Sequence, residues 1–311
     1  MDDSFTIVLE TQDILSGVCG ANDGNLKVIE RSVGGRIAAR GNEIRLEGAD
    51  SDGLERFKLV MDKLISLVRR GEYPSPEHVQ ALSGSEVPVE EGFVHIPHGI
   101  RRVYPRSKNQ ASYIRDMRSH DIAFCVGPAG TGKTYLAIAE ALRLVLSKKM
   151  RKMVLTRPVV EAGESLGFLP GDLIQKINPY LRPLYDAMES LIPYEVIQRM
   201  EETRAIEIAP LAYMRGRSLN ECVVILDEAQ NTTKEQMKMF LTRIGEGARA
   251  VITGDVTQID LPKRQESGLL HALSVLSGVE GLAFAWLHTD DVVRNPLIKK
   301  IIQAYDNYDK N

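Results

Sequence analysis

Residues 127–134 read Gly-Pro-Ala-Gly-Thr-Gly-Lys-Thr, which satisfies the pattern G-x-x-x-x-G-K-[ST] of a phosphate-binding loop. An apolar run precedes the motif and a helix-like apolar stretch follows it, so the loop is expected to join a buried strand to a helix. Backbone N–H groups at a helix N-terminus attract phosphate oxygens, and glycine lets the chain curl closely around them. We therefore expect a nucleoside triphosphate to contact Gly127, Pro128, Ala129, Gly130, Thr131, Gly132, Lys133 and Thr134.

Two residues of this loop carry specific chemistry. Lys133 is expected to reach the β- and γ-phosphate oxygens, and the hydroxyl of Thr134 to be a ligand of Mg²⁺.

A second motif, Val-Val-Ile-Leu-Asp-Glu-Ala-Gln at residues 223–230, brings two carboxylates to the end of an apolar strand. This is the Walker B arrangement that accompanies a phosphate-binding loop. We expect Asp227 to hold Mg²⁺ through water and Glu228 to orient or deprotonate the attacking water.

Two glutamines extend the predicted site. The segment Gly254-Asp-Val-Thr-Gln258 resembles the GDxxQ motif of helicase superfamily 1, which implies that Gln258 senses the γ-phosphate while Asp255 shapes the loop. Ser107-Lys-Asn-Gln110 resembles the adenine-reading Q motif of the same superfamily. The amide of a glutamine offers both a donor and an acceptor, which matches the edge of adenine. Gln110 is thus the expected adenine contact, which favours ATP.

Arg157 follows a predicted strand, at the place where superfamily 1 helicases contact single-stranded nucleic acid. Its guanidinium is expected either to pair with a phosphate or to form a salt bridge with Glu161 or Glu164.

From residue 99 onward, short apolar runs alternate with stretches of helical periodicity, which is typical of an α/β protein with a parallel sheet flanked by helices. Ligands bind beyond the carboxyl ends of such strands, and all the motifs above fall there. We expect strands at 122–126, 153–156, 205–209, 223–226, 250–253 and 282–287, and helices at 134–147, 172–190, 234–244, 267–277 and 296–305.

The remaining sequence predicts a small α+β domain over residues 1–72 and a linker over the proline-containing residues 73–98, before a nucleotide-binding domain at 99–311. In the domain over residues 1–72, the predicted order is strand, helix, glycine-flanked turn, helix, hairpin and long helix. This order is similar to that of the KH nucleic-acid module. The turn from Gly20 to Gly24 is one residue longer than a GxxG loop, and Asp23 would face phosphates. RNA binding and packing or protein contact are therefore both open for this KH-like domain.

Composition limits the remaining alternatives. Hydrophobic residues make up 43% and charged residues 26% of the chain, and no apolar run is long enough to span a membrane. Three widely spaced cysteines favour reduced thiols in a cytoplasmic protein. His95 and His98 have no metal-ligand spacing to other candidates and are interpreted as structural.

Together these motifs resemble the PhoH-like family of ATPases over residues 90–308, through TRPVVEAGE, LAYMRGRSLN, ILDEAQN, TGDVTQIDLP and VVRNPLIKKII. The resemblance implies a P-loop, RecA-like fold, Mg²⁺-dependent ATP hydrolysis, a role linked to RNA and multimeric assembly. It extends to the KH-like domain of the bacterial subfamily that lacks a nuclease. No acidic nuclease constellation of the PIN type occurs, so RNA cleavage is not expected.

Helicases of superfamily 1 use a second lobe to supply arginines, but the chain after Gln258 is too short for a lobe of about 150 residues. An arginine finger accelerates hydrolysis by about 10³–10⁵-fold, so we expect a neighbouring subunit to supply one. A hexameric ring is one assembly that would allow this. The candidates are Arg294, Arg215 and Arg217.

A basic cluster is a candidate for contact with RNA or an acidic neighbour, a solvated helix face being the alternative. It consists of Arg101, Arg102, Arg106, Lys108, Arg115 and Arg118.

Three functions follow from these patterns. The first is an oligomeric, RNA-associated ATPase, with unwinding or translocation as a possible extension. The second is a nucleotide-switched adaptor that recruits a ribonuclease or a ribosomal factor. The third, transfer of phosphate to a small molecule, fits less well because the motifs are built around an attacking water.

Overall fold

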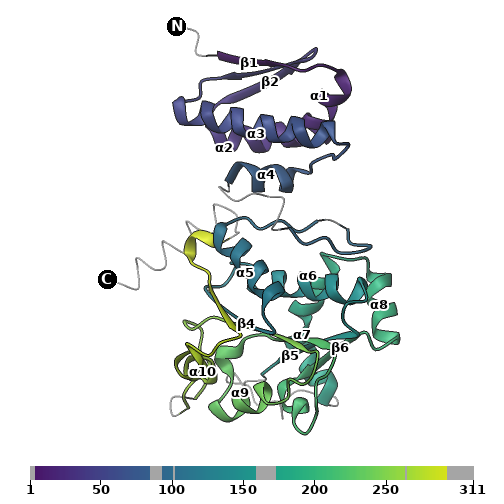
Figure 1. The fold of residues 1–311 in the computed structure, drawn as a ribbon, viewed down its shortest axis with the longest axis vertical. Helices are drawn as coiled ribbons and strands as arrows, with labels where there is room; N and C mark the ends of the chain where they lie inside the picture. Colours follow the sequence, from purple (N-terminus) through teal and green to yellow (C-terminus); the bar gives the residue numbers. More distant parts are fainter. Residues whose placement is uncertain (1–3, 85–92, 101, 159–172, 263–264, 293–311) are drawn as a thin grey trace. The chain divides into compact units, whose positions relative to one another are not determined.

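The computed structural model describes residues 4–84, 93–100, 102–158, 173–262 and 265–292 (Figure 1). The chain divides into two compact units, which are treated separately below. The first consists of Met1–Gly92 with Tyr104–Lys108, and the second of Phe93–Val103 with Asn109–Asn311.

The first unit is a three-stranded antiparallel sheet, ordered β1-β3-β2, that packs against helices. The long helix α3 buries Phe57, Met61 and Leu64 completely in this core, because its apolar residues recur at helical spacing. The order of elements predicted for the KH-like domain is confirmed. It runs β1 (Ser4–Val8), α1 (Gln12–Cys19), α2 (Gly24–Val33), β2 (Arg36–Arg40), β3 (Glu43–Glu47) and α3 (Ser51–Arg69).

The glycine-flanked turn between α1 and α2 is a short 3-10 helix, Ala21–Asp23, entered through Gly20 at φ 69°. Asn25, which is fully buried, donates from its amide to the carbonyls of Val18 at 3.1 Å and Pro74 at 3.0 Å. The turn is therefore anchored within this unit by buried hydrogen bonds, and its contact with RNA stays a prediction.

The predicted linker over residues 73–98 is wrong at both of its ends: Val94 and Ile96 are buried in the core of the second unit, and an earlier part is helical. Residues Pro76–Gly84 form helix α4, which buries Val79 and Leu82 in the core of the first unit. The prolines that suggested a linker include Pro76, which stands at the first position of the helix, where its missing N–H does no harm.

The second unit contains a six-stranded sheet in the order β6-β5-β7-β8-β4-β9, and all its strand pairs are parallel. All six predicted strands are confirmed, with ends that differ by one residue at most. They are β4 (Ile122–Val126), β5 (Lys152–Arg157), β6 (Ile206–Pro210), β7 (Cys222–Leu226), β8 (Arg249–Gly254) and β9 (Leu282–Trp286).

Helices cover both faces of this sheet (Figure 1). Successive strand residues point to opposite faces, so Cys125 faces one core and Phe124 the other. The first core packs against α5 (Lys108–Ser119), α6 (Lys133–Leu146), α7 (Leu173–Glu189) and α8 (Tyr194–Glu202), and the second against α9 (Lys234–Leu241) and α10 (Gly268–Leu276).

Other expectations have mixed outcomes. All three cysteines are buried and none forms a disulfide. Among the described residues, no helix is long and apolar enough to cross a bilayer. The helix predicted at 296–305 lies outside the described residues, whereas α8 was not predicted.

An ion-pair network lies at the beginning of two neighbouring strands, β5 and β6. Arg217 binds both carboxylate oxygens of Glu207, at 2.5 and 2.9 Å, and Lys152 binds the same carboxylate at 3.1 Å. Arg217 is thus held within its own chain near the amino end of the sheet, opposite to the predicted site. This contact argues against the expectation that Arg217 reaches a neighbouring subunit.

The same network gives a test of stability. Hydrogen bonds from Arg217 and Lys152 lower the pKa of Glu207 from 4.5 to about 2, although burial opposes the shift. A carboxyl group with a depressed folded pKa stabilises the fold above its unfolded pKa, and this stabilisation is lost as the pH falls. We expect Glu207→Gln to lower the free energy of unfolding by about 1–2 kcal/mol at about pH 7, after a discount for partial exposure.

Urea unfolding of wild type and Glu207→Gln at a series of pH values measures this effect. The difference between them should shrink as the pH falls from 4.5 toward 2. Glu202→Gln, a change at an exposed position, is the matched control and should show no such difference. A difference for Glu207→Gln that does not depend on pH would contradict the explanation.

Candidate functional site

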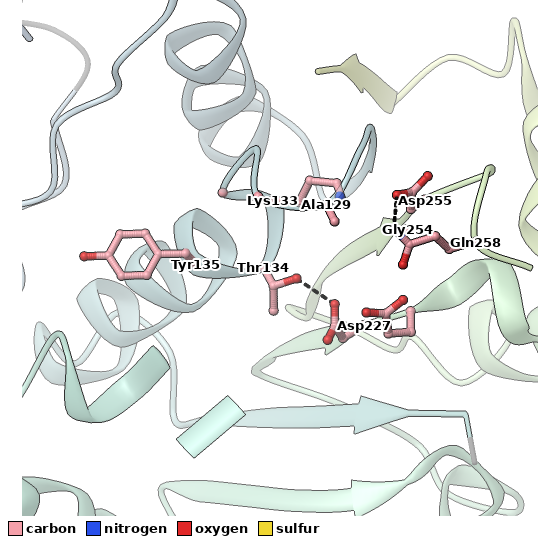
Figure 2. Close-up of a pocket in the computed structure, with 11 residues that line it drawn as sticks. Ala129, Lys133, Thr134, Tyr135, Asp227, Gly254, Asp255 and Gln258 are labelled. Carbon is pink, nitrogen blue, oxygen red and sulfur yellow. Dashed lines mark hydrogen bonds between the residues drawn. The ribbon is translucent and has the colours of Figure 1, made fainter. Parts of the chain in front are cut away.

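The phosphate-binding loop, the Walker B carboxylates and the GDxxQ segment follow the carboxyl ends of β4, β7 and β8, so they meet at one edge of the second unit's sheet. Strand β8 lies between β4, which leads into the phosphate-binding loop, and β7, which leads into the two carboxylates. A cleft of about 260 Å³ opens at this edge (Figure 2). Its lining includes Gly132, Lys133, Thr134, Asp227, Glu228 and Gln258.

The phosphate-binding loop has the backbone that its glycines allow. Gly130 and Gly132 both have φ of 83°, which is unfavourable for other residues. Gly127 serves for a different reason, because a Cβ at this position would lie 2.5 Å from the carbonyl oxygen of Leu287. The loop therefore adopts the curled form that the motif predicts.

Lys133 folds back over this loop. Its ammonium donates to the carbonyls of Gly127 at 2.6 Å and Pro128 at 2.8 Å. Burial lowers the pKa of Lys133 from its ordinary value, and the carboxylate of Asp255 opposes the shift. The amine thus lies over the concave face of the loop, where phosphate oxygens would replace the two carbonyls.

The hydroxyl and carboxylate predicted to hold Mg²⁺ are in contact. Thr134 Oγ1 donates to Asp227 Oδ1 at 2.6 Å (Figure 2). Thr253 of β8 donates to the same oxygen at 2.8 Å. Mg²⁺ prefers oxygen ligands and is typically bound by one or two protein groups together with water and phosphate. Thr134 and Asp227 supply this donor set next to the loop, so the residues present fit the ion.

Glu228 is held in an unusual conformation. Its φ of 52° places a non-glycine residue in the left-handed region, at a cost of about 1–3 kcal/mol that functional sites often carry. Its Oε2 accepts a hydrogen bond from Gln230 at 2.5 Å, and its Oε1 pairs with Arg157 at 3.2 Å. The predicted partners of Arg157, Glu161 and Glu164, lie outside the described residues, so the ion pair with Glu228 is an addition to the prediction.

Gln258 and Asp255 lie at the same cleft. The Oδ1 atom of Asp255 accepts hydrogen bonds from the backbone N–H and the hydroxyl of Thr257, and its Oδ2 atom accepts one from Gln258 at 3.0 Å. Asp255 therefore shapes the loop, as expected. Gln258 is exposed at the edge of the cleft, and its contact with a γ-phosphate stays a prediction.

Sequence reasoning missed the role of Gln230. This side chain is fully buried, and its amide donates to Glu228 and to the carbonyl of Gln258 while accepting from the N–H of Asp255. Gln230 thus connects the two loops that carry the catalytic candidates. Its position two residues after Glu228 in the DEAQ run was the available signal.

Gln110, the expected adenine contact, is buried beneath the phosphate-binding loop. It lies in α5, is only 3% exposed, and donates to the carbonyl of Thr131 at 2.9 Å. Its neighbour Asn109 donates to Asp291 at 3.0 Å. In this structure Gln110 supports the phosphate-binding loop from behind, and its contact with adenine stays a prediction.

The described residues of the basic cluster are divided between the two units. Arg106 and Lys108 belong to the first unit, whereas Arg115 and Arg118 belong to the second. Arg118 pairs with the buried carboxylate of Glu140 at 3.2 Å, which gives it a structural role. Arg101 lies outside the described residues.

Of the three candidate arginines for a neighbouring site, Arg215 is exposed and Arg217 is ion-paired as described above. Arg294 lies outside the described residues.

Comparison with known proteins agrees with this geometry. The family model described as PhoH-like protein matches residues 102–306. A PhoH-like protein from Mycobacterium tuberculosis is 45% identical over 305 residues, which cover 96% of this chain and 86% of that protein. One from Bacillus subtilis is 44% identical over 307 residues, with 96% of each chain covered.

Among solved structures, the Pif1 helicase from Candida albicans aligns with a TM-score of 0.32 and 16% identity, over 62% of this chain and 42% of that one. The match to the family model and the two relatives, which align along almost the whole sequence, establish the family membership of this chain. The chain, with its phosphate-binding loop at the edge of a parallel sheet, therefore belongs to the PhoH-like family and has a P-loop NTPase fold.

Proposed function

We propose that the protein is a Mg²⁺-dependent ATPase whose turnover is coupled to RNA binding in an oligomer. The observation that carries the proposal is the 2.6 Å contact between Thr134 and Asp227, with Glu228 next in the chain at the same cleft. A carboxylate next to the expected Mg²⁺ ligands is suited to orient or deprotonate an attacking water.

The residues of the cleft divide the work of hydrolysis. The loop N–H groups and Lys133 bind the β- and γ-phosphates, while Thr134 and Asp227 hold Mg²⁺. When bound, Mg²⁺ neutralises charge on the phosphate oxygens. Glu228 orients the attacking water and accepts its proton, and Gln258 contacts the γ-phosphate.

The association with RNA and the oligomer rest on separate arguments. The family resemblance and the KH-like order of elements in the first unit support a role linked to RNA. The family resemblance also supports an oligomer, in which a neighbouring subunit would supply an arginine finger. Arg294 and Arg215 are the candidates for this arginine.

Substitutions at the cleft test the hydrolytic function. We expect Glu228→Gln to lower kcat by about 10²–10³-fold while nucleotide still binds, because the water loses its general base. Lys133→Ala should instead abolish nucleotide binding. Steady-state turnover and binding of a fluorescent ATP analogue measure the two effects. Lys149→Ala, at an exposed position, is the control, and normal turnover by Glu228→Gln would contradict the assignment.

Mixed subunits test the arginine supplied in trans. Arg294→Ala or Arg215→Ala should lower turnover by about 10²-fold or more if that residue is the finger. A Lys133→Ala subunit cannot bind nucleotide but still carries the arginine, so mixing the two variants should restore activity that neither has alone. Full turnover per subunit in a dilute, monomeric sample would contradict the shared site.

The role of Gln110 is tested by comparing nucleotides. If Gln110 reads adenine, Gln110→Ala should weaken ATP binding by about 1–2 kcal/mol and leave GTP binding unchanged. Equal weakening of both nucleotides, measured by calorimetric titration, would show instead that Gln110 acts only by supporting the loop.

A further inference from the structure

The carboxylate of Glu228 is engaged at both oxygens. Gln230 donates to Oε2 at 2.5 Å, and Arg157 pairs with Oε1 at 3.2 Å. A carboxylate that orients water must direct an oxygen toward that water, and partners bound to both of its oxygens compete with the water for this position. The two contacts therefore control how well Glu228 can act.

The two contacts differ in how easily they can change. Gln230 is fully buried, and its amide is fixed at both ends by Asp255 and Gln258. The side chain of Arg157 is 22% exposed and stands at the last residue of β5, at the edge of the sheet. Arg157 is thus the contact that a ligand from solvent can displace.

Sheet order decides from which side that ligand comes. From the phosphate-binding loop outward, the strands run β4, β8, β7 and β5. With about 4.8 Å between neighbouring strands, β5 lies about 14 Å from β4. Arg157 therefore flanks Glu228 on the side away from the phosphate-binding loop, so a ligand that draws it outward is a second anion rather than the bound nucleotide.

The surface beside Arg157 has the features of a single-strand RNA contact. Its backbone partner in the sheet is Pro210, the last residue of β6, and the chain continues into the 3-10 helix Leu211–Met214. Tyr213 in that helix is 47% exposed, and Arg215 after it is exposed. An exposed aromatic ring two residues before an exposed arginine suits stacked bases and backbone phosphates better than it suits an acidic peptide.

We propose that Arg157 is a positioning residue that restrains Glu228 between turnovers, and that a phosphate of single-stranded RNA takes Arg157 from Glu228 and so raises turnover. Phosphate and carboxylate compete for the same guanidinium, and no covalent change is involved. This inference rests on the proposed function, since it requires that Glu228 supports hydrolysis.

The kinetic test is steady-state ATPase activity of Arg157→Ala with and without poly(U). We expect its basal kcat to rise about threefold to tenfold with KM for ATP unchanged, the size expected when a half-buried ion pair is lost. Poly(U) should then give no further stimulation. Arg157→Lys keeps a charge but not the fork of donors, and should give an intermediate basal rate.

Controls separate this effect from general damage. Arg182→Ala removes an exposed arginine that pairs with Asp186 at 2.8 Å on α7, and should behave as wild type. Arg157→Ala combined with Glu228→Gln should be as slow as Glu228→Gln alone, because the gain acts through Glu228. A lower kcat in Arg157→Ala, or stimulation by poly(U) equal to that of wild type, would overturn the proposal.

A binding measurement tests the competition without hydrolysis. Coupling between two ligands of one group is reciprocal, so removing the charge of Glu228 removes a competitor for Arg157. Fluorescence anisotropy with labelled poly(U), in the absence of nucleotide, should show that Glu228→Gln binds about threefold to tenfold more tightly than wild type. Adding Arg157→Ala should abolish the gain.

The outcomes distinguish this inference from the proposed function. If wild type has no ATPase activity, either with or without poly(U), the proposed function itself is refuted. Active wild type with equal poly(U) affinity in wild type and Glu228→Gln would refute only the competition. Stimulation by poly-glutamate but not by poly(U) would show that the competing anion is a protein, which also overturns the proposal.

Discussion

The parallel sheet with β8 between β4 and β7 is the constraint on which the rest of the site depends. It sets the phosphate-binding loop and the Walker B carboxylates two strands apart, so that a polyphosphate fits between them. It also delivers Thr253 from the intervening strand to the carboxylate of Asp227. Because every strand runs the same way, the carboxyl ends of β4, β5, β7 and β8 share one edge.

Adjacent carboxylates at this edge have opposite environments. Asp227 is buried and accepts hydrogen bonds from the hydroxyls of Thr134 and Thr253, which fixes its position. Glu228 is partly exposed, has a left-handed backbone, and is held by Arg157 and Gln230. A fixed group suits a ligand of Mg²⁺, whereas a partly exposed group suits contact with water.

Sequence patterns were sufficient for the strands of the parallel sheet and for the centre of the site. The six strands and the contact between Thr134 and Asp227 follow from strand patterning and from motifs whose spacing has a mechanical reason. Helix α4 was missed because prolines and serines around it suggested a linker, although Val79 and Leu82 carry its packing. Side-chain partners across the sheet, such as Arg157 with Glu228, depend on strand order, which local patterns do not encode.

The central claim is that the edge of this sheet binds and hydrolyses a nucleoside triphosphate between the loop and the Walker B carboxylates. A crystal structure with Mg²⁺ and a non-hydrolysable ATP analogue tests it most directly. The account predicts that the Lys133 ammonium leaves the carbonyls of Gly127 and Pro128 for phosphate oxygens, with Mg²⁺ beside Thr134 and Asp227. A nucleotide bound elsewhere, or a Lys133 still folded onto the loop with the analogue present, would contradict it.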